Sequence, residues 1–348
     1  MLDVVVSTDA PSNIRREILG VVEFSSEARP PTIEGGHPVV GVATYRNPRQ
    51  AVREVWTTSC EVTTGRRGDI VYSQDGRHLF GVLALPDSSR YRDAARTAYR
   101  QLVDLIRELD YPHLVRMWNY ISGINQPNAD GLEVYQDFCQ GRAEGFEAAY
   151  TDVTGSLPAA TGIGAHSGGV VVYFVAERSG SCVHFENPRQ VPAHQYPRTY
   201  GPRSPSFARA TLLRDSNRLF LSGTASIIGH RSVELGRLEG QYNTTLDNIR
   251  LLLADIERKC GGTISLGSFS LLKVYVRHAA DAPYVRQRLR EVIGPRVPIE
   301  VFTVDICRSE LLLEIEGVLH VELADAADPH DHLGAGKWIG AGGQRAHP

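Results

Sequence analysis

The hydrophobic positions along the chain predict one order of strands and helices that occurs twice. In the first half this order is strand 77–85, helix 91–109, strand 113–121 and a helix at about 131–149. Within the helix at 91–109, apolar residues recur every three or four positions, as on one helical face, at Ala95, Tyr99, Leu102, Ile106 and Leu109.

The second half repeats the order with different residues. Its predicted elements are strand 218–224, helix 244–260, strand 269–277, helix 283–293 and two closing strands at 299–306 and 311–321. Asp281 is suited to cap the helix at 283–293, and Gly294-Pro295 stops it. The repetition predicts two units of similar build.

Alternating strands and helices are typical of α/β layers, in which helices cover one face of a mixed sheet. The first strands of the two halves also resemble each other, Arg77-His78-Leu79-Phe80-Gly81 against Arg218-Leu219-Phe220-Leu221-Ser222. We therefore predict an α/β fold made of duplicated β-α-β-α-β units.

Composition suggests where the units are joined. Residues 155–206 are dense in Gly, Pro, Ser and aromatic residues, which predicts strands joined by long ordered loops. We expect an N-terminal half at 1–154, a C-terminal half with these central binding loops at 155–325, and a flexible tail at 326–348.

Overall composition narrows the class of protein. The 348 residues are 42% hydrophobic and 22% charged, as in an ordinary globular protein. A net charge of -3 without a basic run argues against nucleic acid or a membrane surface as partner. No apolar stretch approaches the roughly 20 residues that span a bilayer, and the N-terminus lacks the basic start of a signal peptide. We expect a cytoplasmic protein.

The cysteines and histidines give no sign of a disulfide framework or a metal site. The five cysteines, at 60, 139, 182, 260 and 307, are scattered and form no C-x-x-C pair, so free thiols are expected. Of the twelve histidines, His330 and His332 lie in the tail and the others are isolated, so no metal is expected.

The last predicted strand carries two carboxylates among aliphatic residues. Side chains alternate across a strand, so Glu314 and Glu316 share one face and Leu313 and Ile315 the other. A carboxyl group buried among apolar side chains has a raised pKa and can donate a proton near neutral pH, which makes Glu314 a candidate acid. The alternative is that both glutamates lie on the solvent-exposed (wet) face of an amphipathic strand. The strand alone does not decide between the two interpretations.

Arginines and tyrosines gather in the proline-rich segment 196–209. Arg203 and Arg209 lie there with Tyr200, and guanidinium groups can hold both oxygens of a carboxylate. Tyr135 and Arg142 are seven positions apart on one predicted helix and so lie near one face. Any single arginine could instead be a surface residue or a tie to loop carbonyls.

Gly223 lies in a turn at the end of a predicted strand. A glycine there either permits close packing of the backbone or leaves space for a ligand ring. The surrounding residues match neither a phosphate-binding loop of the GxxxxGK[ST] type nor a GxGxxG dinucleotide fingerprint.

Several longer motifs together resemble the chorismatase family. They are WNYISGIN (118–125), NADGLEVY (128–135), AATGIGAH (159–166), ENP (186–188) and YGPR (200–203). The resemblance extends from about residue 54 to 321, and the C-terminal Leu-Glu-Ile-Glu-Gly strand is also similar to the small trimeric deaminases called RidA. It implies RidA-like units that imitate such a trimer within one chain.

The resemblance also implies a substrate and roles. Chorismate carries two carboxylates and an enol ether, and Glu314 matches the catalytic acid of the family. Arg142, Arg203 and Arg209 are then expected to bind the carboxylates, and Tyr135 and Tyr200 to orient the substrate, in a monomer without a cofactor.

Two positions bear on the product. In hydrolytic members of the family alanines occupy the positions of Gly223 and Cys307, whereas members that form 3-hydroxybenzoate resemble this chain. The resemblance thus implies release of pyruvate and formation of 3-hydroxybenzoate by attack of the ring 4-hydroxyl, through an arene oxide. The alternative is hydrolysis to a dihydroxycyclohexadiene carboxylate.

Two other classes of function stay open. The fold could carry a non-catalytic sensor of a small molecule, since fold alone does not fix function. An enamine deaminase is the other, because Arg296 precedes a predicted strand where such enzymes place a substrate-binding arginine.

Overall fold

The structure is a computed structural model that describes residues 2–8, 14–45, 50–149 and 157–322. Its first sheet has the strand order β1-β5-β2-β4-β3 and comes from the N-terminal part of the chain. The strands of this sheet are β1 (Asp3–Ser7), β2 (Glu17–Ser25), β3 (Arg29–Glu34), β4 (His37–Ala43) and β5 (Val52–Thr58). No helix is formed within this described N-terminal stretch, and the sequence analysis predicted none of its strands.

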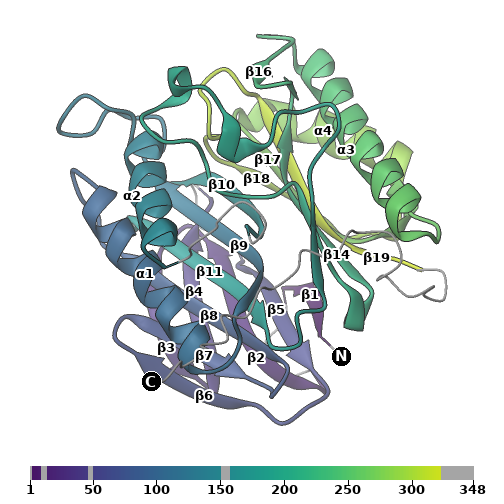
Figure 1. Cartoon of the computed structure of the whole chain (residues 1–348). Helices are drawn as coiled ribbons and strands as arrows, with labels where there is room; N and C mark the ends of the chain where they lie inside the picture. Colours follow the sequence, from purple (N-terminus) through teal and green to yellow (C-terminus); the bar gives the residue numbers. More distant parts are fainter. Residues whose placement is uncertain (1, 9–13, 46–49, 150–156, 323–348) are drawn as a thin grey trace, which may run out of the picture.

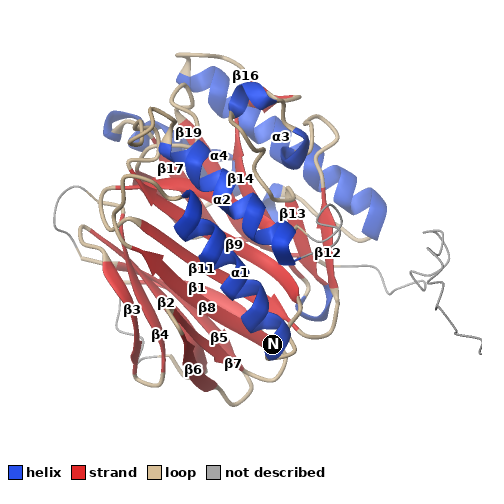
Figure 2. Cartoon of the chain, turned by 60° about the vertical axis from the view of Figure 1, so that its left-hand side comes forward, coloured by secondary structure: helices blue, strands red, loops and turns tan. Residues whose placement is uncertain are grey.

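The second sheet has the order β10-β9-β11-β8-β7-β6. Its strands are β6 (Thr63–Arg67), β7 (Ile70–Gln74), β8 (His78–Leu85), β9 (His113–Ser122), β10 (Ala159–Ala165) and β11 (Val170–Glu177). Helices α1 (Arg92–Glu108) and α2 (Val134–Ala149) lie side by side over one face of it (Figure 2). The helical stripe predicted around Tyr99 is buried against this sheet.

The third sheet has the order β12-β13-β14-β19-β17-β18. Its strands are β12 (Cys182–Phe185), β13 (Ala210–Leu213), β14 (Arg218–Ala225), β17 (Phe269–Val276), β18 (Ile299–Thr303) and β19 (Leu313–His320). Helices α3 (Leu238–Cys260) and α4 (Ala282–Ile293) cover its outer face (Figure 1). A small hairpin of β15 (Ile227–Ile228) and β16 (Arg231–Ser232) follows β14.

The second and third sheets correspond strand for strand. In each, the edge strand that follows the second helix is parallel to its neighbour: β10 to β9, and β18 to β17. In each, the last strand runs antiparallel to the strands on either side of it, as β11 and β19 both do. The α/β fold with duplicated units and mixed sheets is therefore confirmed.

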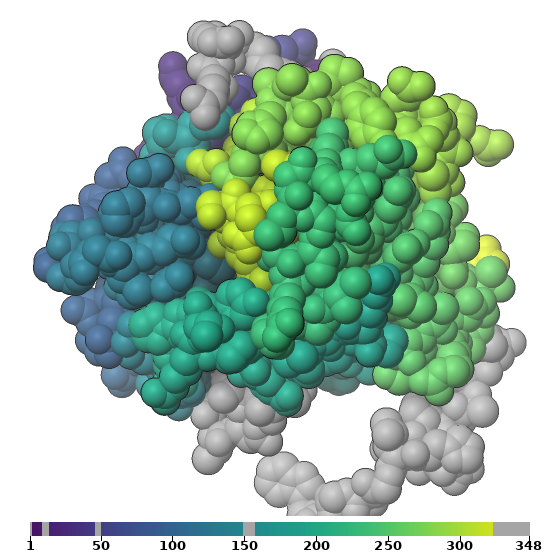
Figure 3. Space-filling model, turned by 90° about the horizontal axis from the view of Figure 1, so that it is seen from above, coloured from purple at the N-terminus to yellow at the C-terminus, as the bar shows by residue number. Residues whose placement is uncertain are grey.

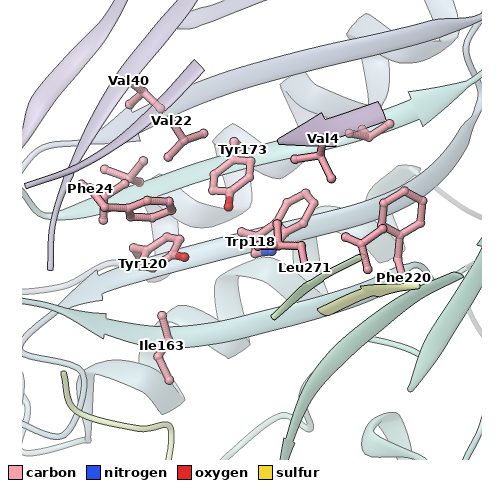
Figure 4. Packing of buried hydrophobic residues seen from close by; sticks show 14 of the residues in the cluster. Val4, Val22, Phe24, Val40, Trp118, Tyr120, Ile163, Tyr173, Phe220 and Leu271 are labelled. Atoms are coloured by element: carbon pink, nitrogen blue, oxygen red, sulfur yellow. The ribbon is translucent and has the colours of Figure 1, made fainter. Parts of the chain in front are cut away.

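The inner faces of all three sheets share one core (Figure 4). Phe24 comes from the first sheet, Trp118 and Tyr173 from the second, and Phe220 and Leu271 from the third. Large aromatic side chains bury extensive apolar surface, so they dominate the packing between the sheets. Three sheets around one core agree with the expected pseudo-trimeric arrangement within one chain.

Four charged side chains are buried in this core. Lys273 Nζ lies 2.7 Å from Glu54 Oε2 and 2.8 Å from Glu316 Oε1, and Arg116 Nη2 lies 2.5 Å from Glu316 Oε2. We call Glu54, Arg116, Lys273 and Glu316 the core ion cluster. Each sheet contributes at least one member and the charges cancel, so all members are compensated; removing one would leave a buried charge unpaired.

Sheet membership differs from the expected division of the chain at residue 154. Strands β10 and β11 follow that point in the sequence, yet they pair with β9 and β8 and complete the second sheet. The difference arises because β10 and β11 pair with strands that are distant in the sequence. Amino-acid composition does not predict such pairing. The expected flexible tail, 326–348, lies outside the described residues.

Three further expectations concern thiols, metal ions and membranes. All five cysteines are free thiols. Across the described ranges, no cluster of three or more His, Cys, Asp or Glu side chains could hold a metal ion. None of the helices that the structure describes is long and apolar enough to cross a membrane.

Candidate active site

A cavity of about 160 Å³ lies between the second and third sheets. Its floor comes from Ala160 and Gly162 on β10, Gly223 on β14 and Glu314 on β19. Its walls come from the segment 196–209 and the loop 307–310. In Figure 3, the yellow C-terminal part of the chain reaches the surface between the blue part, which belongs to the second sheet and its helices, and the green part, which belongs to the third. The volume suits a small molecule.

Glu314 lies on the cavity floor and is 4% exposed, and two further acids, Glu133 and Glu310, also line the cavity. Cys307 Sγ donates a hydrogen bond to Glu314 Oε2 at 3.7 Å. Burial raises the pKa of Glu314 to about 8, and the nearby charge of Glu316 adds to the rise. Glu314 therefore carries a proton at neutral pH and faces the cavity with it.

Glu316, two residues further along the same strand, has the opposite state. Burial alone would raise its pKa, but the charges of Lys273 and Arg116 outweigh burial and the pKa is lowered. Trp118 Nε1 and the Tyr275 hydroxyl also donate to it, at 3.0 and 2.8 Å. Both glutamates are buried, so the wet-face alternative is wrong; Glu316 is an ionised structural residue.

Gly223 makes room for the acid. A Cβ atom built at this position would overlap Glu314 Oε1. The missing side chain thus leaves space for the carboxyl group of Glu314. Cys307 lines the same cavity, and burial raises the pKa of its thiol well above the usual value, so the thiol is protonated.

Two arginines line the cavity. Arg209 is buried; its Nη2 donates to the Tyr196 hydroxyl at 2.7 Å, and its Nε makes no hydrogen bond within the described part of the chain but lies 3.9 Å from Glu186 Oε2. Arg308 lies with its guanidinium carbon 3.9 Å from the centre of the Tyr200 ring. Its Nη1 donates to His230 O and Ser232 Oγ, while its buried Nη2 is likewise unpartnered among the described residues.

The sequence analysis missed Arg308 and Tyr196. The available signal was position: Arg308 directly follows Cys307 in a short loop between two strands. Tyr196 opens the proline-rich segment that was singled out, but only Tyr200 was selected from it. Tyr135 and Tyr200 line the cavity, and their expected role in orienting a substrate stays a prediction. Burial raises the pKa of Tyr135 well above its usual value, so its hydroxyl stays a hydrogen-bond donor.

Three other predicted arginines do not reach the cavity. Arg203 is half-buried, forms an ion pair with Glu147 on α2 and does not line the cavity, so its expected place in the site is corrected. Arg296 is exposed and does not line the cavity, which removes the feature that favoured a deaminase. Arg142 is fully buried over the Phe138 ring and does not line the cavity.

Known proteins of one family are similar to this chain along nearly its whole length. A family model described as chorismatase FkbO/Hyg5-like, N-terminal, matches residues 54–176. A 3-hydroxybenzoate synthase of Streptomyces hygroscopicus is 43% identical over 316 residues, covering 88% of this chain and 92% of the relative. A chorismatase of Streptomyces rapamycinicus is 41% identical over 309 residues, covering 87% and 92%.

A solved structure agrees with these sequence relatives. The crystal structure of a chorismatase superposes on this chain with a TM-score of 0.88 and 39% sequence identity. The match covers 92% of this chain and 98% of that one. The three sheets and the cavity between two of them thus belong to a fold already seen by experiment.

The proton on Glu314 links stability to pH. Its folded-state pKa of about 8 lies above the ordinary 4.5 that it regains on unfolding. The folded state therefore binds this proton more tightly, and the resulting stability is complete below pH 4.5 and lost as the pH rises through 8. We predict that Glu314→Gln gains stability relative to wild type over this range, by up to about 1.4 kcal/mol per pH unit.

Urea unfolding at a series of pH values measures this difference. Glu61 is exposed, so Glu61→Gln serves as the matched control and should follow the wild-type curve. Parallel curves for wild type and Glu314→Gln would contradict a raised pKa.

Proposed function

The chain belongs to the chorismatase family, and we propose that it converts chorismate to 3-hydroxybenzoate and pyruvate. The observation that carries the proposal is a protonated carboxylic acid, Glu314, facing a small cavity lined by two arginines, each with one nitrogen that makes no hydrogen bond among the described residues. Chorismate needs both features, because it carries two carboxylates and an enol ether that is cleaved by an acid.

Arg209 and Arg308 are suited to the two carboxylates. Each has one buried nitrogen that makes no hydrogen bond among the described residues, although Arg209 Nε lies 3.9 Å from Glu186 Oε2, and a buried N–H of a guanidinium is costly unless an acceptor reaches it. One further nitrogen of each is held by hydrogen bonds, Arg209 Nη2 by Tyr196 and Arg308 Nη1 by the β15–β16 hairpin. The guanidinium groups are therefore held in place before the substrate binds.

The first chemical step is proton transfer from Glu314 to the methylene carbon of the enolpyruvyl group. The ether carbon then gains oxocarbenium character, and the bond between the ether oxygen and ring C3 breaks to give the carbonyl of pyruvate. Because burial disfavours ionised Glu314 and raises its pKa to about 8, the carboxyl group still carries its proton at neutral pH and is available as the general acid.

The second step stays within the substrate. The ring 4-hydroxyl oxygen forms a bond to C3 as pyruvate leaves and loses its proton, which gives an arene oxide. Opening of this oxide and loss of a ring proton give 3-hydroxybenzoate. Together the two products contain every atom of chorismate, so no water is consumed.

Gly223 and Cys307 support this route over hydrolysis. Both line the cavity around Glu314, and the pair resembles that of the members that form 3-hydroxybenzoate. The relative that is 43% identical is itself a 3-hydroxybenzoate synthase. Hydrolysis to the dihydroxycyclohexadiene carboxylate remains the second candidate, because other relatives are described only as chorismatases. Action as a monomer in the cytoplasm, and substrate binding by Arg142, stay predictions.

Incubation of the protein with chorismate in water enriched in oxygen-18 tests the reaction and the route. We predict equal amounts of pyruvate and 3-hydroxybenzoate, with no label in the phenol because its oxygen comes from the 4-hydroxyl. Only the ring product is informative, since pyruvate exchanges its carbonyl oxygen with water. Mass spectrometry of the separated products provides the measurement.

Glu314→Gln is the control for this assay. It should lower kcat by about 10²- to 10⁴-fold, because the amide cannot donate a proton as an acid does. Absence of pyruvate from the wild-type reaction would refute the function; a dihydrodiol as product, or label in the phenol, would refute the intramolecular route alone.

The arginines can be tested by the Michaelis constant. Arg209→Met and Arg308→Met should each raise KM by about tenfold or more, since each removes a hydrogen bond to a charged group. Arg203→Met should leave KM within about twofold, because Arg203 pairs with Glu147 outside the cavity. A large rise in KM for Arg203→Met, with little change for the other two, would reverse the assignment.

A further inference from the structure

The pairing of β14 with β19 is interrupted beside the acid. The register shifts between Leu221 and Thr224, so Ser222 and Gly223 form a bulge outside the regular ladder. A buried backbone N–H that leaves a ladder needs another acceptor. The Gly223 N–H finds it in the other sheet, where Thr161 Oγ1 on β10 accepts it at 3.1 Å.

The hydroxyl of Thr161 is fully occupied. It accepts from Arg116 Nη2 at 2.6 Å and from Gly223 N, and it donates to Glu316 Oε2. A hydroxyl offers one donor and two acceptor positions, so every position is used. Thr161 is 1% exposed, and its orientation is therefore fixed by the core ion cluster.

The fixed hydroxyl of Thr161 holds the backbone of Gly223, and this backbone forms one wall beside the carboxyl group of Glu314. Glu314 Oε1 occupies the space that a side chain at Gly223 would fill, so a shift of the Gly223 backbone moves the wall against the carboxyl group. Thr161 itself does not line the cavity, whereas its neighbours Ala160 and Gly162 do. Because side chains alternate along a strand, Thr161 acts from behind the floor.

We propose that Thr161 is a positioning residue for this reaction, which holds the bulge at Gly223 against Glu314 and so fixes the direction in which the acid presents its proton. The proposal rests on the proposed function. The hydroxyl is the essential part, because its three hydrogen bonds join the bulge to Arg116 and Glu316.

Thr161→Val removes the hydroxyl at nearly constant volume. It should lower kcat by about 10- to 100-fold, because a small displacement of a catalytic group is enough for such a loss, while KM stays within about threefold. Thr161→Ser keeps the hydroxyl and should retain kcat within about threefold of wild type. A larger share of dihydrodiol among the products of Thr161→Val is also expected.

Thr211→Val is the matched control. Thr211 Oγ1 is also buried and accepts a backbone N–H across the same boundary between sheets, from Ala159 at 2.9 Å, but it contacts neither Glu316 nor Gly223. Its loss should lower the urea midpoint and leave kcat near the wild-type value. An equal fall in kcat for Thr211→Val would show that general loosening of the interface is the cause, and would overturn the proposal.

A second pair of variants covers a failure to fold. If Thr161→Val is not folded by circular dichroism, Thr161→Ala is compared with Thr161→Ser, since the two differ by one oxygen atom. Equal kcat for the members of this pair, or unchanged kcat for Thr161→Val, would overturn the role of Thr161. A wild-type protein that releases no pyruvate from chorismate would instead refute the proposed function.

Discussion

The pairing of Glu316 with Lys273 and Arg116 is the interaction on which the rest of the structure depends. It places an ionised carboxylate in a buried position, and this is tolerated only because two cations and several hydrogen bonds compensate it. Lys273 extends the pairing to Glu54, so all three sheets are tied at one point. The fixed charge of Glu316 also helps to keep the proton on Glu314. The same buried ion pairs thus stabilise the fold and help to keep Glu314 protonated.

The duplicated halves have divided their tasks. Strand β19 of the third sheet carries both glutamates, whereas the corresponding strand β11 of the second sheet is buried throughout and has its one acid at its end. The second sheet supplies groups that hold Glu316 in place, among them Arg116 and Thr161. Two carboxylates on one strand with pKa values moved in opposite directions are a common sign of acid catalysis.

Much of the fold was predictable, because helices and buried strands leave a period in the sequence. The first sheet was not, since strands such as Arg29–Glu34 are short, partly exposed and interrupted by prolines, so they carry no clear alternation. Glu314 was found as a carboxylate in an apolar strand and through the family resemblance. The partners of Glu316, which are Arg116 and Lys273, were not found, because buried charges are rare and their pairing joins residues far apart in the sequence. Arg203 and Arg308 show the same limit, since sequence does not tell which way a loop arginine points.

The state of Glu314 in the folded protein is the central claim, and infrared difference spectroscopy between wild type and Glu314→Gln measures it without a substrate. A protonated carboxylic acid has a C=O stretching band that is separate from the bands of a carboxylate and shifts in deuterated water. We predict this band in the wild-type protein at neutral pH, and its loss as the pH is raised past about 8. A carboxylate signal from Glu314 at neutral pH would contradict it.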